Sequence, residues 1–156
     1  MSHILMRGRL PLPKVVVTID GKPVAKERPR KSRSGVIYTP AKTQKYEKRV
    51  KECYRAQSGF RFDDGVPIDS RIYVYFQIPK STSKKNRAKM LSGEIRPTKR
   101  PDYDNLGKTI SDALNGVAYK DDAQIVDAQV RKFYGDRWKI VVVLQEVNNG
   151  QQQSGD

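Results

Sequence analysis

Four aspartates in the second half of the chain have the type and spacing of residues that do chemistry. Asp102 and Asp104 stand in the run DYDN, and Asp121 and Asp122 form an adjacent pair further on. Carboxylates crowded in this way repel one another unless a cation lies among them. Mg²⁺ prefers oxygen ligands of this kind and keeps several of its waters. The pattern therefore predicts a site for a hard divalent cation, with one ion or with two about 3.5 to 4 Å apart.

A lysine accompanies the first acidic pair. Lys108 follows Asp104 by one helical turn, so the two share a helix face, opposite the apolar stripe of Leu106 and Ile110. A bound metal ion lowers the pKa of a coordinated water, and a nearby ammonium stabilises charge that develops in the transition state. Together these residues predict metal-dependent cleavage of a phosphodiester.

Each acidic residue also has a plainer interpretation. Asp102 or Asp104 could act only as a helix N-cap, and Asp121 with Asp122 could form only a polar turn. The coincidence of both pairs with a lysine, in a chain of formal net charge +14, favours the catalytic interpretation.

Other nucleophilic mechanisms are excluded. Cys53 recurs at helical spacing with Tyr46, Val50 and Tyr54, which predicts a core position. The single histidine, His3, lies in the N-terminal leader and offers no partner base. The mechanisms of cysteine and serine hydrolases therefore do not apply.

The positive charge is clustered into two stretches. Residues 26–58 hold 11 basic residues against three glutamates, and residues 79–100 hold eight against one. Loops of this composition track phosphate backbones and supply sequence-independent affinity for nucleic acid. The residues predicted to bind DNA are Lys26, Arg28, Arg30, Lys31, Arg33, Lys84, Lys85, Arg87, Lys99 and Arg100.

Several classes of protein are excluded by what the chain lacks. It has no apolar run near the roughly 18 residues of a membrane span, and its first residues lack the apolar core of about 7 to 15 residues that a secretory signal needs. A single cysteine cannot form an internal disulfide. We therefore expect a cytoplasmic protein without a membrane partner.

Three helices are predicted. Thr39 offers an N-cap hydroxyl and Pro40 a first helical position for a helix that ends near Ser58. A short basic helix is expected over 81–91, and a helix over 105–115 carries Asp102 and Asp104 at its start.

Strands are predicted over 15–19, 36–38 and 72–78, the last with strict alternation of apolar residues. Two more, over 124–134 and 137–146, flank Gly135 and Asp136, a dipeptide suited to a tight hairpin. If the strand after Asp122 lies beside the one that ends at Ile78, three or four of the carboxylates converge.

These elements predict a single α+β domain, with a small, mostly antiparallel or mixed sheet and two main helices packed on it. The domain is expected to span 1–147, with 1–14 as a flexible leader and 148–156 as a disordered tail.

Three motifs make the chain resemble a known family, the RusA family of Holliday junction resolvases, which includes many phage-encoded members. They are RPDYDNLGK at 100–108, DALNG at 112–116 and KDDAQI at 120–125. Shorter similarities are RPR at 28–30, YTP at 38–40 and SKKNR at 83–87. The resemblance runs from about Gly21 to Tyr134.

The resemblance implies a homodimeric, Mg²⁺-dependent endonuclease that resolves four-way DNA junctions by paired symmetric nicks in recombination and repair. Mn²⁺ is expected to substitute for Mg²⁺. The residues that it assigns to the site are Asp102, Asp104 and Asp122 as metal ligands, Asp121 as a neighbouring acidic position, and Lys108 as the catalytic lysine.

The chain departs from the family at Pro101, where some members have a functional arginine; Arg100 or Lys99 is the cation that could replace it. Two other functions fit the residues. One is a metal-dependent nuclease for flaps or other branched DNA, and the other is a non-catalytic basic DNA-binding protein whose aspartates cap a helix.

Overall fold

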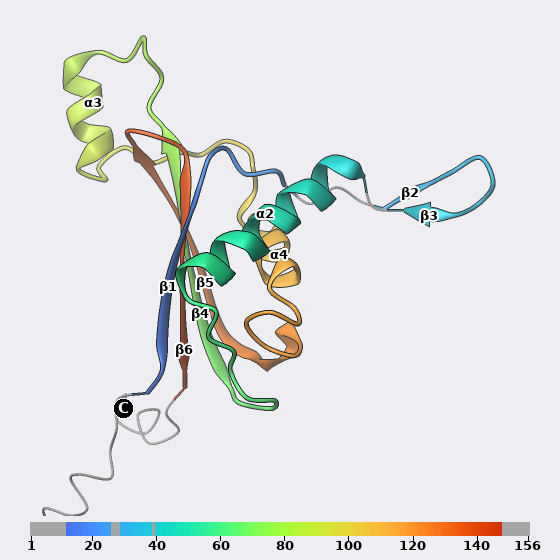
Figure 1. Cartoon of the computed structure of the whole chain (residues 1–156). Helices are drawn as coiled ribbons and strands as arrows, with labels where there is room; N and C mark the ends of the chain where they lie inside the picture. Colours follow the sequence, from blue (N-terminus) through green and yellow to red (C-terminus); the bar gives the residue numbers. More distant parts are fainter. Residues whose placement is uncertain (1–11, 26–28, 39, 148–156) are drawn as a thin grey trace, which may run out of the picture.

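A four-stranded mixed sheet forms the centre of the protein (Figure 1). The computed structural model describes residues 12–25, 29–38 and 40–147. The sheet has the order β1-β6-β4-β5, in which β6 runs antiparallel to both β1 and β4, and β5 runs parallel to β4. The bounds of the strands are Lys14–Asp20 (β1), Ile68–Gln77 (β4), Ile125–Gly135 (β5) and Lys139–Glu146 (β6). The predicted α+β class with a mixed sheet is confirmed.

Strand β4 shows how the sequence makes the sheet. Its even-numbered residues from Ile68 to Phe76 are buried, and the residues between them are half-buried or exposed. This period of two places one side of the strand on a hydrophobic core. Strand β4 pairs with β5 on one edge and, from Ile68 to Tyr75, with β6 on the other, so most of its backbone groups find partners within the sheet.

The predicted hairpin between the last two strands is wrong. Strands β5 and β6 follow one another in the chain, but β4 lies between them in the sheet. The turn at Gly135 and Asp136 therefore carries the chain past β4. Gly135 accepts a hydrogen bond from the Ile78 amide at 3.0 Å, and a Cβ there would lie 3.4 Å from the Tyr75 side chain.

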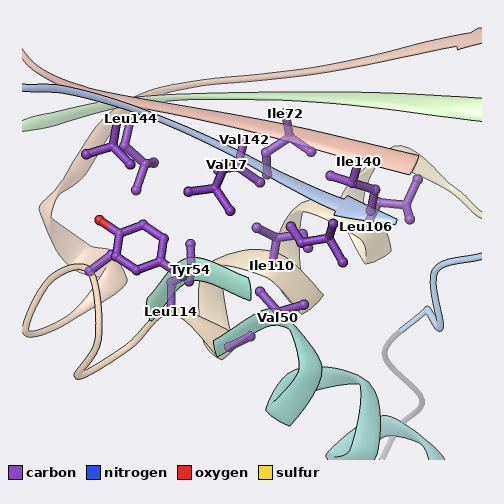
Figure 2. Close-up of a cluster of buried hydrophobic side chains, with 14 of the residues drawn as sticks. Val17, Val50, Tyr54, Ile72, Leu106, Ile110, Leu114, Ile140, Val142 and Leu144 are labelled. Carbon is purple, nitrogen blue, oxygen red and sulfur yellow. The ribbon is translucent and has the colours of Figure 1, made fainter. Parts of the chain in front are cut away.

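Two helices cover one face of the sheet, as predicted. Helix α2 (Ala41–Gln57) and helix α4 (Tyr103–Ala113) pack against it and against each other. Figure 2 shows side chains from both helices and from the strands meeting in one cluster. Its buried members include Val17, Val50, Tyr54, Ile72, Leu106, Ile110, Leu114, Ile140, Val142 and Leu144. Cys53 is half-buried against this core, so its predicted structural role holds.

Several boundaries differ from the predictions. The N-cap of α2 is Pro40, one residue later than expected, and Thr39 lies outside the described residues. Helix α4 begins at Tyr103, so Asp102 is its N-cap and Asp104 is in its first turn. Lys14, which the prediction places in the flexible leader, pairs with Gln145 in the sheet. The first residues, 1–11, and the predicted tail, 148–156, lie outside the described residues.

Two basic elements project from this body (Figure 1). Helix α3 (Lys84–Leu91) has no buried residue and begins three residues later than expected, because Ser83 Oγ accepts a capping hydrogen bond from the Asn86 amide at 3.2 Å. Strands β2 (Arg30–Lys31) and β3 (Ile37–Tyr38) form a separate two-stranded hairpin, of which the sequence predicted only the second strand. No helix in the described parts of the chain is long and apolar enough to cross a membrane.

We expect Ile110→Ala to lower the free energy of unfolding by about 2 to 5 kcal/mol, because it leaves a cavity between α4 and the sheet. Ile110 is 1% exposed. Leu91 on α3 is 56% exposed, so Leu91→Ala should change that free energy by less than about 0.5 kcal/mol. Urea denaturation followed by far-UV circular dichroism measures both. Equal losses in the two variants would contradict the packing described here.

Candidate active site

The start of α4 holds the first acidic pair and the lysine. Asp104 and Lys108 are exposed, and both line a cavity of about 230 Å³ between α4 and strands β4 and β5. Their shared helix face, predicted from spacing, is thus observed, and Leu106 and Ile110 on the other face are buried. An ammonium and a carboxylate border the same space.

The helix lies close to the strand at this cavity. A Cβ at Gly107 would lie 3.2 Å from Val130 Cγ2 of β5, tighter than an ordinary van der Waals contact. The neighbouring residues Tyr103 and Ser111 line the cavity from the helix side, and Ala128 and Gln129 line it from the strand.

Asp102 is the N-cap residue of α4, but its side chain makes no capping hydrogen bond. The interpretation in which this carboxylate only caps the helix is therefore not supported. Its charge acts on Lys132 of β5: burial lowers the pKa of the lysine, and the Asp102 carboxylate opposes that shift. The Lys132 ammonium also donates a hydrogen bond to the Lys99 carbonyl. Asp102 thus lies near the carboxyl-terminal half of β5.

The second acidic pair forms a firmly held turn. Asp121 Oδ1 accepts a hydrogen bond from the Ala123 amide at 2.9 Å and caps a short 3-10 helix, η1 (Asp122–Gln124). The Asp122 amide donates to Asn115 Oδ1 at 2.8 Å. Gln124 Nε2 donates to the carbonyls of Asp63 and Val66 at 3.0 and 3.1 Å. Asp121 therefore caps η1 within the polar turn that the plainer interpretation expects, and the Asp122 carboxylate lies beside it.

The two carboxylates of this turn differ in acidity. The hydrogen bond with Asp121 raises the pKa of Asp122, and burial and the charge of Asp112 raise it further. The bond from the Ala123 amide lowers the pKa of Asp121. Asp122 is thus the less acidic of the two carboxylates, and a cation there would relieve the repulsion between them.

The structure does not bring the two acidic pairs together within one chain. Asp102 and Asp104 lie at the first turn of α4, whereas Asp122 contacts Asn115, just beyond the last turn. A helix rises about 1.5 Å per residue, so Asp104 and Asp112 are about 12 Å apart along its axis. Among the described residues, no three His, Cys, Asp or Glu side chains are grouped closely enough to hold a metal ion. The strand after Asp122 does lie beside β4, as expected, but the length of α4 separates the pairs.

The predicted DNA-binding residues fall on three exposed parts of the molecule. One is the β2-β3 hairpin, the second is α3, and the third is the segment before α4; Figure 1 shows the start of α4 between the other two. The described members of the set are Arg30, Lys31, Arg33, Lys84, Lys85, Arg87, Lys99 and Arg100, all exposed. Lys26 and Arg28 lie outside the described residues.

Three residues near the site escaped the sequence analysis. Asn115 and Asp112 act on Asp122 through a hydrogen bond and through charge. Both stand in the DALNG motif, so this motif could have indicated that they lie near the site. Lys132 lies near Asp102 from a strand distant in sequence, and no local pattern indicates that proximity.

Comparisons with known proteins show the family of the chain. The family model of endodeoxyribonuclease RusA matches residues 20–145. The class of the protein is therefore that of an endodeoxyribonuclease. The chain belongs to the RusA family, whose members act on Holliday junctions. An uncharacterized protein, YqaN of Bacillus subtilis (strain 168), is 40% identical over 136 residues, which cover 84% of this chain and 95% of that protein.

Proposed function

We propose that the protein resolves four-way DNA junctions by paired symmetric nicks, in a Mg²⁺-dependent reaction that serves recombination or repair. Beyond membership of the family, one observation carries the proposal: Asp104 and Lys108 line the same cavity at the start of α4. A carboxylate that can hold a cation and an ammonium that can stabilise an oxyanion thus meet where a phosphate can enter.

The residues present fit a hard divalent ion. Their donor atoms are carboxylate oxygens, the ligands that Mg²⁺ and Mn²⁺ prefer. Asp102 has no capping hydrogen bond, and the pKa of Asp122 is raised by its acidic neighbours. Asp102, Asp104 and Asp122 would hold the ion, with Asp121 positioning Asp122. When bound, the ion lowers the pKa of a coordinated water and neutralises charge on the scissile phosphate.

The basic elements hold the substrate. The hairpin residues Arg30, Lys31 and Arg33 and the exposed cations of α3 contact the arms of the junction through their phosphates. Lys108 lies beside the cleaved phosphate, where its ammonium stabilises the negative charge of the transition state more than that of the ground state.

The proposed enzyme is a homodimer in which the two chains complete each other's ion site. Paired nicks require two sites related by a twofold axis. In the sheet order, β5 is an edge strand, and its residues 126–129 are exposed. Antiparallel pairing of this edge with a second copy would bring the start of one β5, with Asp122, to the end of the other, near Asp102.

We expect Asp104→Asn to abolish most cleavage of a synthetic four-way junction with little loss of binding, because the change removes a metal ligand and leaves the basic surface intact. Cleavage is measured with Mg²⁺ and with EDTA, on four-way junction, flap and linear duplex, and binding by gel shift. Wild-type cleavage in EDTA would contradict the metal mechanism. Equal cleavage of flaps would indicate a broader nuclease, and loss of binding in the variant would make Asp104 structural.

Lys108→Ala should lower kcat about 10²- to 10³-fold at saturating Mg²⁺, with KM for the junction little changed, because the lysine acts in the transition state. Lys108→Arg keeps the charge and should retain more activity. Single-turnover rates over a Mg²⁺ titration make the measurement. Full rescue of Lys108→Ala by added Mg²⁺ would instead assign the lysine to ion binding.

Two expected results follow from the dimer proposal. Light scattering at micromolar protein should give twice the mass of one chain. In addition, a mixture of Asp104→Asn and Asp122→Asn chains should recover nicking that neither variant shows alone, because a mixed dimer retains one site without a substitution. A monomer that still makes paired nicks, or a mixture as inactive as its components, would refute the shared sites.

A further inference from the structure

A second and larger cavity lies beside the start of α4. It has a volume of about 710 Å³ and is not lined by Asp104 or Lys108. Three segments distant in the sequence form it: Lys22–Ala25 after β1, Lys42 in the first turn of α2, and Arg100–Asp102 with Asn105 at the start of α4. None of these lining residues belongs to the hairpin or to α3, the two basic projections.

One side of this cavity is positively charged. Lys22, Lys42 and Arg100 are all exposed there, against the single carboxylate of Asp102. Both α2 and α4 begin at the cavity, and the N-terminal end of a helix carries partial positive charge. The first turn of α2 contains no acidic residue and has no side-chain cap to offset that charge. The cavity therefore favours an anionic group.

The other side is apolar. Pro23 is buried, and Val24, Ala25 and Pro101 are partly buried along the wall. A phosphate ion makes no use of such a wall, and the volume falls in the range of roughly 300 to 1,000 Å³ that encloses organic ligands. A nucleotide matches both sides, with its phosphate at the cations and its sugar and base against the prolines and aliphatic groups.

The position of the cavity indicates where in the substrate such a nucleotide would lie. Asp102 is part of its wall and is also one of the residues that would hold the ion, so an occupant lies next to the cleaved phosphate. A base enters a pocket of this kind only by leaving the stack, and unstacking costs least where the base is already unpaired, as at a branch point.

We propose that this cavity binds one nucleotide of the cleaved strand, extruded from the stack at the branch point beside the cut. Lys22, Lys42 and Arg100 hold its phosphate, and the wall from Pro23 to Ala25 receives its sugar and base. The inference rests on the proposed function, because it takes branched DNA as the substrate. It would also select branched DNA over a continuous duplex, because every base of a duplex is stacked and paired and enters the cavity only at a higher cost.

The test uses four-way junctions that carry 2-aminopurine at each position around the branch in turn, bound in Ca²⁺. The fluorescence of this base rises when it unstacks. The wild type should give a several-fold rise at one position adjacent to the mapped cut. Lys42→Ala and Ala25→Trp, which remove a cation and fill the cavity, should each lose at least half of that rise and cleave the junction about tenfold more slowly.

Lys48→Ala is the matched control, because Lys48 is an exposed lysine of the same helix that does not line the cavity. It should keep the full rise. Thermal melting of each variant checks that the fold is retained, and Lys42→Ala, a surface change, serves if Ala25→Trp fails to fold. An equal loss in Lys48→Ala would assign the effect to general electrostatics and overturn the proposal.

The two hypotheses fail separately in this experiment. A wild type that cleaves junctions but gives no rise at any position would overturn the nucleotide cavity and leave the resolvase function standing. A wild type that cleaves no DNA, yet gives a rise that Lys42→Ala removes, would overturn the proposed function and support the cavity as a DNA-binding site.

Discussion

The burial of one stripe of α4 is the constraint on which the candidate site depends. Leu106 and Ile110 are each 1% exposed against the sheet. Because a helix repeats every 3.6 residues, fixing this stripe in the core fixes the direction of every other side chain on the helix. Asp104 and Lys108 are thereby directed to the cavity along β5, and Gly107 between them lets the helix approach Val130. The apolar core thus positions the polar chemistry.

The sequence predicts the features that depend on residues close together in the chain, and it misses those that depend on residues far apart. The alternation in β4 and the apolar stripe of α4 are local patterns with strong burial behind them, and both elements were correctly predicted. The motif residues at the start of α4 also fell where their spacing placed them. The hairpin at Gly135 and Asp136 was predicted wrongly, because a turn dipeptide says nothing of whether a strand is inserted between the two that it joins. The strand β2 was missed because its two residues, Arg30 and Lys31, are too few to show an alternating pattern.

The separation of the two acidic pairs is a similar case, because their spacing in the sequence does not give the distance between them in space. The expectation of convergence rested on the strand after Asp122 lying beside β4, and it left the length of α4 out of account. In the structure the return is packed in place: Tyr119 is fully buried and donates a hydrogen bond to the Ser111 carbonyl at 2.7 Å, and Ala118 accepts one from the Phe62 amide at 2.8 Å. These contacts hold the acidic turn at the far end of α4.

This anchoring bears on how an ion site can be completed. Asn115 and Gln124 tie the turn of Asp121 and Asp122 to the end of α4 and to the segment before β4. Moving this turn about 12 Å along the helix to meet Asp104 would break these hydrogen bonds, including those to the half-buried Asn115 and Val66. In the proposed ion site, carboxylates fixed at both ends of α4 would meet only if the second set came from another chain. The rigidity of the turn therefore favours a shared site over a rearrangement within one chain. It also explains why a single chain can present a well-ordered acidic turn without gathering the carboxylates that the proposed ion would need.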